Sequence, residues 1–388
     1  MNYLVISPYY PQNFQQFTIE LANKGITVLG IGQEPYEQLD EPLRNSLTEY
    51  FRVENLENLD EVKRAVAFLF YKHGPIDRIE SHNEYWLELD AALREQFNVF
   101  GAKPKDLKKT KFKSEMKKLF KKAGVPVVPG AVVKAEKDID KAVKKIGLPL
   151  IAKPDNGVGA AATFKLETPE DVDHFKAEWD GHTEYFFEKF VTSSEICTFD
   201  GLVDRDGNIV FSTTFDYAYT PLDLMLYKMD NSYYVLKEMD PKLRQYGEAI
   251  VKAFGMKERF FHIEFFRDGD DYIAIEYNNR PAGGFTIDVY NYAHSIDLYR
   301  GYAAIVAGEP FPASEFEPLY CLATSRRANA AYVLSEEEVL AKYRDQFRVK
   351  KDMPAAFAEL QGDYLYMLTT PSREELEQMI HDFGQRHQ

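Results

Sequence analysis

Residues 260–284, FFHIEFFRDGDDYIAIEYNNRPAGG, decide how the rest of the chain is interpreted. Two apolar runs flank a polar turn rich in Asp and Gly, which is typical of a β-hairpin. Alternation along the strands predicts that Glu264 and Glu276 oppose each other on one face, with Asn278 two residues further along that face. Two carboxylates and an amide oxygen at one point favour a hard cation such as Mg²⁺, which usually also binds substrate phosphate oxygens.

The alternative is a surface hairpin whose acids are solvated. Acids inside runs such as FFHIEFF would be partly buried, and buried charges need partners, so we favour a site. Arg280 follows on the same face, and its planar guanidinium suits a phosphate or a carboxylate.

The composition favours a soluble protein of two or three packed domains. The 388 residues are 45% hydrophobic, and the net charge of −15 argues against general binding to nucleic acid or an anionic membrane. Cys197 and Cys321 stand among apolar residues, where we expect buried, unreactive thiols. We see neither a signal peptide nor an apolar run long enough for a membrane span, and we therefore expect a cytoplasmic protein.

The first 100 residues alternate strand and helix signals, which predicts a parallel sheet with crossover helices. Expected strands are 3–7, 26–31, 50–53 and 76–81, and expected helices are 15–23, 59–73 and one that ends near 97. No glycine-rich fingerprint follows the first strand, so a nucleotide site in this part is a weak hypothesis. Tyr9, Asn83 and Glu84 follow strand ends, where such sheets bind ligands, although ordinary loop residues are the simpler interpretation.

The middle of the chain contains a second candidate site. Residues 101–124 form a lysine-rich helical region, and a strand at 150–154 carries Lys153 before a loop of small residues at 155–162. Glycine lets backbone N–H groups approach a polyphosphate, but no Gly-Lys-Ser/Thr ending makes this loop a Walker A motif. Further expectations are strands at 131–133, 163–166 and 185–191, helices at 139–146, 241–254 and 296–307, a hairpin at 196–203 and 208–214, and a long loop or lid at 217–234.

The last block is expected to be small and antiparallel. Strands are predicted at 319–325, 330–334 and 364–369, followed by a terminal helix at 373–383.

Four blocks in this order resemble the ATP-grasp superfamily, in its carboxylate–amine ligase branch. They are KAGVP at 122–126 after the lysine-bearing helix, IAKP at 151–154 with its glycine loop, EKFV at 188–191 followed by Glu195, and Glu264 with EYNNRP at 276–281. The resemblance implies an α/β fold in three parts. These are a Rossmann-like parallel-sheet domain at 1–104, a two-lobed α+β ATP-grasp domain at 105–312 (lobes at about 105–190 and 191–312) and a small α+β domain at 313–388.

The resemblance also implies roles for individual residues. Lys113 and Lys153 would contact the phosphates of ATP, and Gly157 and Gly159 would cover them. Glu188 would lie near the adenine amino group, and the backbone of Lys189, Phe190 and Val191 would bind the edge of the adenine ring. Glu195 would accept hydrogen bonds from the ribose hydroxyls. Lys111 is an alternative to Lys113, because relatives usually show Asp where this chain has Phe112. Glu264, Glu276 and Asn278 would hold Mg²⁺, with Mn²⁺ as an alternative metal, and Arg280 with Lys153 would stabilise the transferred phosphoryl group.

The implied activity is an ADP-forming ligase that activates a carboxylate as an acyl phosphate for attack by an amine, amino-acid or peptide ligation being one form. The alternatives are a reaction like that of carbamoyl-phosphate synthase or of a carboxylase, and an ATP-binding protein without turnover. The expected partners are a small carboxylate and a small amine, without nucleic acid or membrane, and a homodimer is an open expectation. His262 and His294 are candidate bases, although each is more often a structural histidine.

Overall fold

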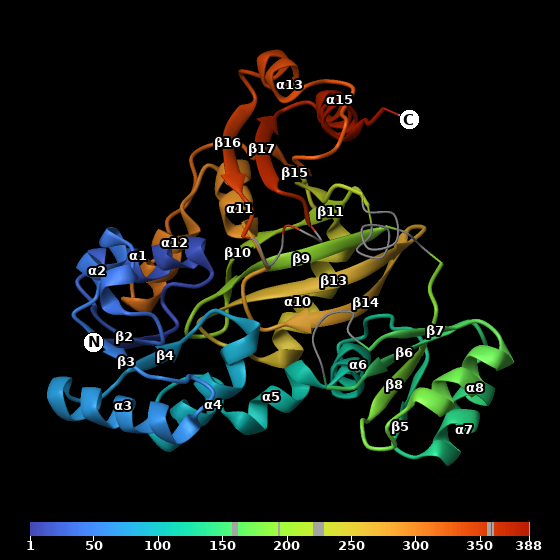
Figure 1. The fold of residues 1–388 in the computed structure, drawn as a ribbon, viewed down its shortest axis with the longest axis horizontal. Helices are drawn as coiled ribbons and strands as arrows, with labels where there is room; N and C mark the ends of the chain where they lie inside the picture. The colour runs from blue at the N-terminus through green and yellow to red at the C-terminus, as the bar shows by residue number, and fades with distance from the viewer. Residues whose placement is uncertain (157–161, 193–194, 220–228, 355–357, 359–360, 388) are drawn as a thin grey trace.

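The computed structural model describes every residue except 157–161, 193–194, 220–228, 355–357, 359–360 and 388. Figure 1 shows three parts of the chain arranged around a large twisted sheet. The N-terminal part (blue) lies to its left, a smaller sheet with two helices (green) to its lower right, and the C-terminal elements (red) at its top.

The N-terminal part is a parallel sheet in the order β3-β2-β1-β4, as predicted. Its elements are β1 (Asn2–Ile6), α1 (Gln15–Asn23), β2 (Thr27–Gly32), α2 (Glu41–Ser46), β3 (Glu49–Arg52), α3 (Leu59–His73), β4 (Arg78–Glu80) and α4 (Leu87–Gln96), with short 3₁₀ turns at Gln12–Phe14, Tyr36–Gln38 and Glu84–Trp86. The sequence sets these limits locally. In α3, for example, the Asn58 side chain caps the first turn, and Gly74 ends the helix at a φ of +88°.

Two helices lead from this part into the small sheet. They are α5 (Pro104–Lys111) and α6 (Lys113–Lys122), so the lysine-rich region is broken at Phe112 rather than continuous. The small sheet is antiparallel in the order β5-β8-β6-β7, and α7 and α8 pack on it around Ile139, Val172 and Phe175. Its elements are β5 (Gly130–Val133), α7 (Glu136–Ile146), β6 (Leu150–Pro154), β7 (Phe164–Leu166), α8 (Pro169–Glu178) and β8 (Tyr185–Lys189).

The large sheet has the order β14-β13-β9-β11-β12-β15-β17-β16, with β10 beside β9. Its strands are β9 (Ile196–Val203), β10 (Ile209–Thr213), β11 (Phe215–Tyr217), β12 (Ser232–Val235), β13 (Arg259–Asp268), β14 (Asp271–Asn278), β15 (Tyr320–Arg326), β16 (Phe347–Asp352) and β17 (Tyr364–Thr370). The C-terminal strands therefore extend the sheet that carries the hairpin. The predicted loop at 217–234 begins and ends in β11 and β12, and its middle lies outside the described residues.

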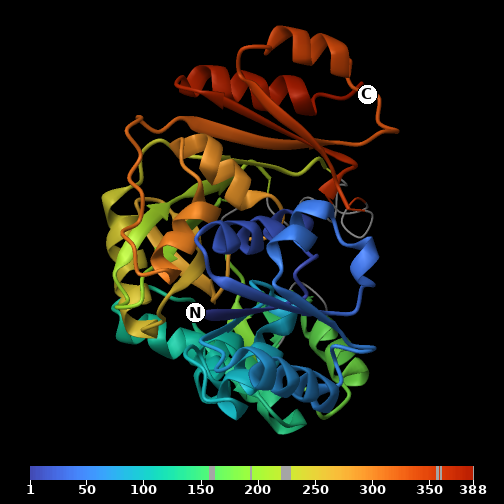
Figure 2. The ribbon, with the colours of Figure 1, turned by 90° about the vertical axis from the view of Figure 1, so that its left-hand side faces the viewer.

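Among the described residues, five helices complete this part. They are α10 (Pro241–Phe254), α11 (Thr286–His294), α12 (Leu298–Val306), α13 (Glu336–Lys342) and α15 (Arg373–Gly384). Figure 2 shows the N-terminal part packed against the orange segment that contains α11 and α12, and α1 contacts α12 directly. The strand predicted at 330–334 is wrong: Tyr332 makes only an isolated bridge with Arg386, because the Ser335 cap starts α13 immediately afterwards. No described helix has the length and apolar character needed to cross a membrane.

A buried ion network joins the N-terminal sheet to β13. Both carboxylate oxygens of Glu80 accept hydrogen bonds from Arg259, at 2.7 and 3.0 Å, and Arg94 donates to Glu80 at 2.9 Å. Beside them, Arg78 and Glu258 form a second buried pair. These pairs fix the position of the hairpin relative to the parallel sheet.

Candidate active site

The two predicted carboxylates face each other on the β13–β14 hairpin. Glu264 pairs directly with Glu276, and the next pair on that face is His262 with Asn278. Residues directly opposite in an antiparallel pair project from the same face. The predicted opposition of Glu264 and Glu276, with Asn278 on their side of the hairpin, is therefore confirmed.

The electrostatics of this pair suit a cation. Burial, together with the charges of Glu264 and Glu84, raises the pKa of Glu276. Burial would also raise the pKa of Glu264, but the interaction with His262, whose Nε2 lies 3.6 Å away, outweighs it and lowers that pKa. Within the described part of the chain, three or more His, Cys, Asp or Glu side chains nowhere gather into a metal site. The protein ligands of a metal here would therefore be the two carboxylates and the Asn278 amide oxygen. The remaining ligands would be oxygens of substrate or water, as is usual for Mg²⁺.

Two lysines on other elements approach the carboxylates. Lys113, the first residue of α6, has its Nζ 3.9 Å from Oε1 of Glu276. Lys153 lies on β6. Burial would lower the pKa of Lys153, but Glu188, and then Glu276 and Glu264, raise it above its ordinary value. Lys111 instead lies 2.9 Å from Glu88, so of the two lysines considered for the phosphates the geometry favours Lys113.

Lys117 is a site residue that the sequence reasoning missed. Its side chain is buried, donates to the carbonyl of Ala274 on β14 at 3.0 Å, and lies 3.3 Å from Glu188. The signal was its spacing, since it stands four residues after Lys113 and next to the buried Met116 on the apolar face of α6.

Glu188 is buried at the end of β8 and is shared by two lysines. Lys153 donates to it at 2.6 Å, and Lys117 lies on its other oxygen. Burial would raise the pKa of Glu188, but Lys117 and Lys153 lower it to about 2. The carboxylate thus holds the side chain of Lys153 in place, and its predicted contact with adenine remains a prediction.

Strand β8 ends at Lys189, directly after Glu188. The N–H groups of Lys189 and Phe190 already donate to the carbonyls of Pro129 and Pro149. The N–H of Val191 is the third in the stretch that was predicted to bind the edge of the adenine ring. Glu195 directly precedes β9, and its mostly exposed carboxylate is 3.4 Å from Arg267. Gly157 and Gly159 lie outside the described residues.

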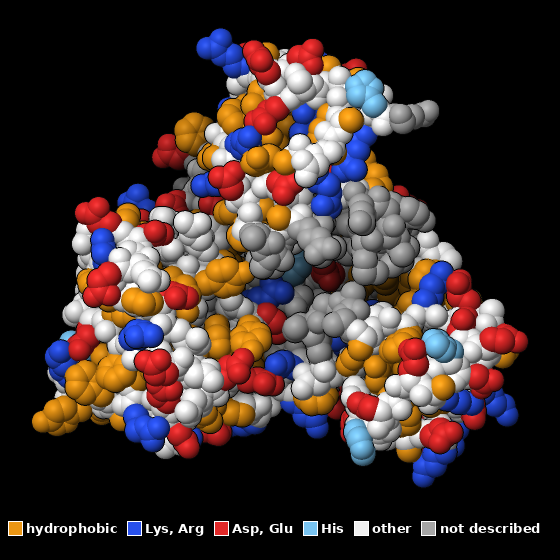
Figure 3. Space-filling view, in the orientation of Figure 1, with side chains coloured by type: hydrophobic (Ala, Val, Ile, Leu, Met, Phe, Trp, Pro, Cys, Tyr) orange, Lys and Arg blue, Asp and Glu red, His pale blue; other side chains and the backbone are white. Residues whose placement is uncertain are grey.

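Arg280 lies where the hairpin meets the N-terminal part. Its Nε donates to Glu84 at 3.0 Å, and one terminal nitrogen donates to the carbonyl of Pro281. Glu84, for which we favoured an ordinary loop role, thus faces the hairpin from the end of the parallel sheet. Figure 3 shows this face of the molecule hollowed between the three parts, with acidic and basic side chains visible inside the hollow.

His262 connects the carboxylates to a buried network. Its Nδ1 is 2.6 Å from Asp200, which also accepts a hydrogen bond from Tyr290, and its Nε2 is 3.6 Å from Glu264. Burial would lower the pKa of His262, but Asp200 raises it to about 9. His294 instead contacts Thr213, and burial lowers its pKa to about 4.

A family model, sequence relatives and solved structures are similar to this chain. The family model described as an ATP-grasp domain matches residues 146–288, which include Lys153, Glu188 and both hairpin strands. The L-arginine-specific L-amino acid ligase of Bacillus subtilis is 26% identical over 258 residues, 62% of this chain and 62% of that protein. A pyruvate carboxylase polypeptide of Methanothermobacter thermautotrophicus is 28% identical over 177 residues, 42% of this chain and 35% of that protein. The matches thus span less than two thirds of these relatives.

Solved structures extend the likeness to the whole fold. The L-amino acid ligase from Bacillus licheniformis superposes with a TM-score of 0.72 at 14% identity, covering 98% of this chain and 97% of that one. Phosphoribosylglycinamide synthetase from Anaerococcus prevotii gives a TM-score of 0.69 at 13% identity, covering 98% and 97%. At such identities the likeness shows the fold alone. Residues 146–288 thus match an ATP-grasp domain, and the similarity to L-amino acid ligases supports the carboxylate–amine ligase branch of that superfamily.

Proposed function

We propose that this protein is an ADP-forming ligase that uses ATP to activate a carboxylate as an acyl phosphate, which an amine then attacks. One observation carries the proposal: Glu264 and Glu276 oppose each other beneath the lysines of two other elements. Opposed carboxylates repel each other unless a cation lies between them, and ATP is a substrate that brings both the cation and anionic phosphates.

The side chains have distinct tasks in this mechanism. Bound Mg²⁺ would be held by Glu264, Glu276 and Asn278 and would neutralise charge on the phosphates. Lys113 and Lys153 bind the phosphate oxygens and orient the γ-phosphorus toward the attacking carboxylate. Because two anions must meet in this step, fixed positive charges in a water-poor site supply most of the stabilisation.

Arg280 serves the substrate side of the reaction. We assign to its guanidinium the binding of the acyl phosphate, and Glu84, its present partner at 3.0 Å, keeps it oriented before substrate arrives. No covalent nucleophile of the protein is required, since the substrate carboxylate itself forms the bond to phosphorus.

The nucleotide base is assigned to the stretch after β8. Two of its N–H groups are already used by Pro129 and Pro149, so we assign the ring-edge donor to the N–H of Val191. Glu195, exposed at the start of β9, remains our assignment for the ribose hydroxyls.

The test is release of ADP and phosphate in the presence of Mg²⁺ and a panel of amino acids, alone and in pairs. A ligase releases phosphate only when both an amino acid that supplies the carboxylate and one that supplies the amine are present, and a dipeptide appears in equal amount by mass spectrometry. Tight ATP binding without release for any pair would contradict turnover and leave a binding protein.

A second candidate is a carboxylase-type reaction in which bicarbonate is the phosphorylated anion. It is favoured by the similarity to the pyruvate carboxylase polypeptide and to the 2-oxoglutarate carboxylase small subunit of Hydrogenobacter thermophilus, which is 26% identical over 150 residues. Adding bicarbonate with free biotin to the same assay separates the two: release that needs biotin and no amino acid would replace the ligase assignment.

A further inference from the structure

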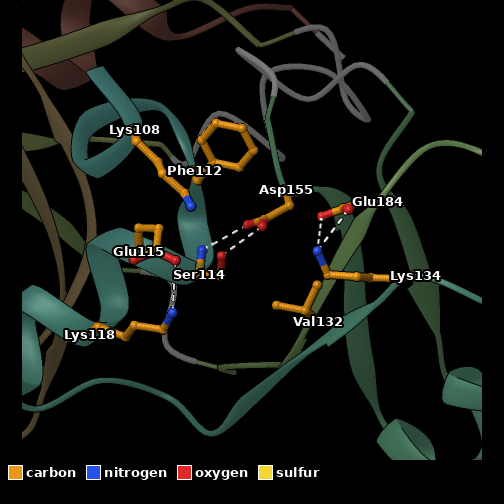
Figure 4. A pocket seen from close by; sticks show the side chains of 9 residues that line it. All are labelled: Lys108, Phe112, Ser114, Glu115, Lys118, Val132, Lys134, Asp155 and Glu184. Atoms are coloured by element: carbon orange, nitrogen blue, oxygen red, sulfur yellow. Dashed lines mark hydrogen bonds and ion pairs between the residues drawn. The ribbon is translucent and has the colours of Figure 1, made fainter. Parts of the chain in front are cut away.

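A polar cavity lies on the side of α6 next to the small sheet (Figure 4). Its volume is about 330 Å³, and it is lined by Lys108, Phe112, Ser114, Glu115, Lys118, Val132, Lys134, Asp155 and Glu184. Most of the charges on its wall pair locally, as Lys134 does with Glu184 and Lys118 with Glu115. Asp155 differs, because Figure 4 shows its carboxylate directed across the cavity at Ser114 on α6.

Asp155 uses each of its polar groups to join α6 to the small sheet. It is only 2% exposed. Its carboxylate accepts from the Ser114 N–H at 2.8 Å and from the Ser114 hydroxyl at 2.6 Å. Its carbonyl accepts from the N–H of Lys113 at 2.9 Å, and its own N–H donates to the backbone carbonyl of Glu184 at 2.8 Å.

These bonds replace a cap that α6 lacks in its own sequence. The N-cap residue is Phe112, which has no side-chain acceptor, so the first N–H groups of the helix need partners from elsewhere. Asp155 supplies them from the residue directly after β6, and Phe112 forms a bridge with Asn156 beside it. The start of α6 is thus fixed to the end of β6.

Each of the joined elements carries a lysine of the site. Lys113 is the residue next to Ser114, and Lys153 stands two residues before Asp155. We propose that Asp155 is a positioning residue: by clamping the first turn of α6 to the end of β6, it sets the spacing of Lys113 from Lys153 and Glu276, and so the affinity of the site for the phosphates of ATP. This inference rests on the proposed function, which assigns both lysines to the phosphates.

The test measures the dissociation constant for Mg·ADP by calorimetry and the KM for Mg·ATP in variants of Asp155. Asp155→Ala should raise both by about tenfold or more, since small misplacements of site groups are costly. Asp155→Asn should stay within about threefold of the parent, because its amide oxygen still accepts from the Ser114 N–H and its NH₂ can donate to the hydroxyl. Thr168→Ala is the matched control, since it removes the cap of α8 in the same sheet-and-helix unit and should lower the melting temperature without changing either constant.

A double-mutant cycle with Lys113→Met separates positioning from plain stabilisation. If Asp155 acts through Lys113, then Asp155→Ala should add less than about threefold in the Lys113→Met background. Equal losses in both backgrounds, or an Asp155→Ala protein that behaves like Thr168→Ala, would overturn the positioning role alone. If Lys113→Met leaves the affinity for Mg·ADP unchanged, the phosphate assignment in the proposed function fails as well.

Discussion

Two regions of the β13–β14 hairpin bury charges in different ways. At one end, Arg259 and Glu80 make two hydrogen bonds of 2.7 and 3.0 Å, and Arg94 adds a third contact to the same carboxylate. Further along, the contacts of the two opposed carboxylates are longer: Lys113 is 3.9 Å from Glu276, His262 is 3.6 Å from Glu264, and the Tyr217 hydroxyl donates to Glu264 only at 3.4 Å. Distances beyond about 3.5 Å are too long for direct hydrogen bonds.

The difference separates a structural charge cluster from the candidate binding site. Close pairs in the first region compensate the cost of burying their charges. In the second region, the raised pKa of Glu276 shows that burial and neighbouring negative charge are not balanced by the protein's own cations. Such a site gains free energy when a cation and an anionic ligand bind.

The largest effect is expected in the structural region. Arg259→Met should leave Glu80 buried with Arg94 as its remaining partner and reduce the free energy of unfolding by about 3–5 kcal/mol. Urea denaturation of the parent and the variant measures this difference in the free energy of unfolding. The control is Lys176→Met, which breaks a surface pair with Asp140 and should cost less than about 1 kcal/mol. Equal losses in both variants would show that the buried pair of Arg259 and Glu80 stabilises the fold no more than a surface pair does.

In the site region, Glu276→Gln should act on turnover rather than on folding. Activity should fall by at least about 100-fold, because residues that merely support metal ligands already cost about 10- to 100-fold. The melting temperature should stay the same or rise, since a buried charge with a raised pKa is removed. The prediction fails if steady-state turnover stays near the parent value in a correctly folded variant.

The structural region should also respond to acid. Burial lowers the pKa of His82, which stacks on Phe17, to about 4, below its ordinary 6.5. Between these two values the unfolded state binds the proton and the folded state does not, so this stability is present above pH 6.5 and is lost as the pH falls toward 4. Between pH 7.5 and 5, the parent should lose about 2 kcal/mol more than His82→Asn.

Asn is chosen because position 82 has a φ of +57°, which Asn tolerates. Burial raises the pKa of nearby Asp90 to about 7, and Asp90 therefore titrates with the opposite sign. It is present in both proteins and cancels from the comparison. Parallel stability curves for the two proteins across this pH range would show that His82 does not carry the effect.

The smallest effect concerns one phosphate contact. Lys153→Met should weaken Mg·ADP binding by roughly tenfold, or about 1.5 kcal/mol, the size of one hydrogen bond to a charged group. Lys141→Met, on α7 of the same unit and paired with Asp138 at the surface, should bind as the parent does. Calorimetric titration of both variants decides, and equal affinities would remove Lys153 from the phosphate site.

Local pattern was enough to predict much of the fold. Helices 15–23, 59–73 and 241–254 and strands 150–154 and 196–203 have their predicted limits, because caps, glycines and periodicity act within a few residues. The opposition of Glu264 and Glu276 was also predicted, but the turn alone does not set it. The register that starts at the turn would place Glu264 opposite Ile275, and a shift of one residue between Glu264 and Phe265 brings Glu276 opposite Glu264.

Contacts between distant segments could not be predicted in this way. Arg280 meets Glu84 across 196 positions, and Asp155 caps α6 through Ser114, which lies 41 positions earlier in the chain. The C-terminal strands were expected in a small domain of their own, yet they continue the large sheet through β12 and β15, a pairing that alternation alone does not specify. Pattern therefore predicted most of the candidate site residues, and tertiary packing supplies the contacts that hold them in place.

The most direct test of the central claim is a crystal structure with Mn²⁺ and a non-hydrolysable ATP analogue, with the metal located by anomalous scattering. We predict a metal between the carboxylates of Glu264 and Glu276, at roughly 2.1 Å from their oxygens, with the triphosphate extending toward Lys113 and Lys153. A metal and nucleotide bound elsewhere, with these carboxylates outside their coordination, would contradict the claim.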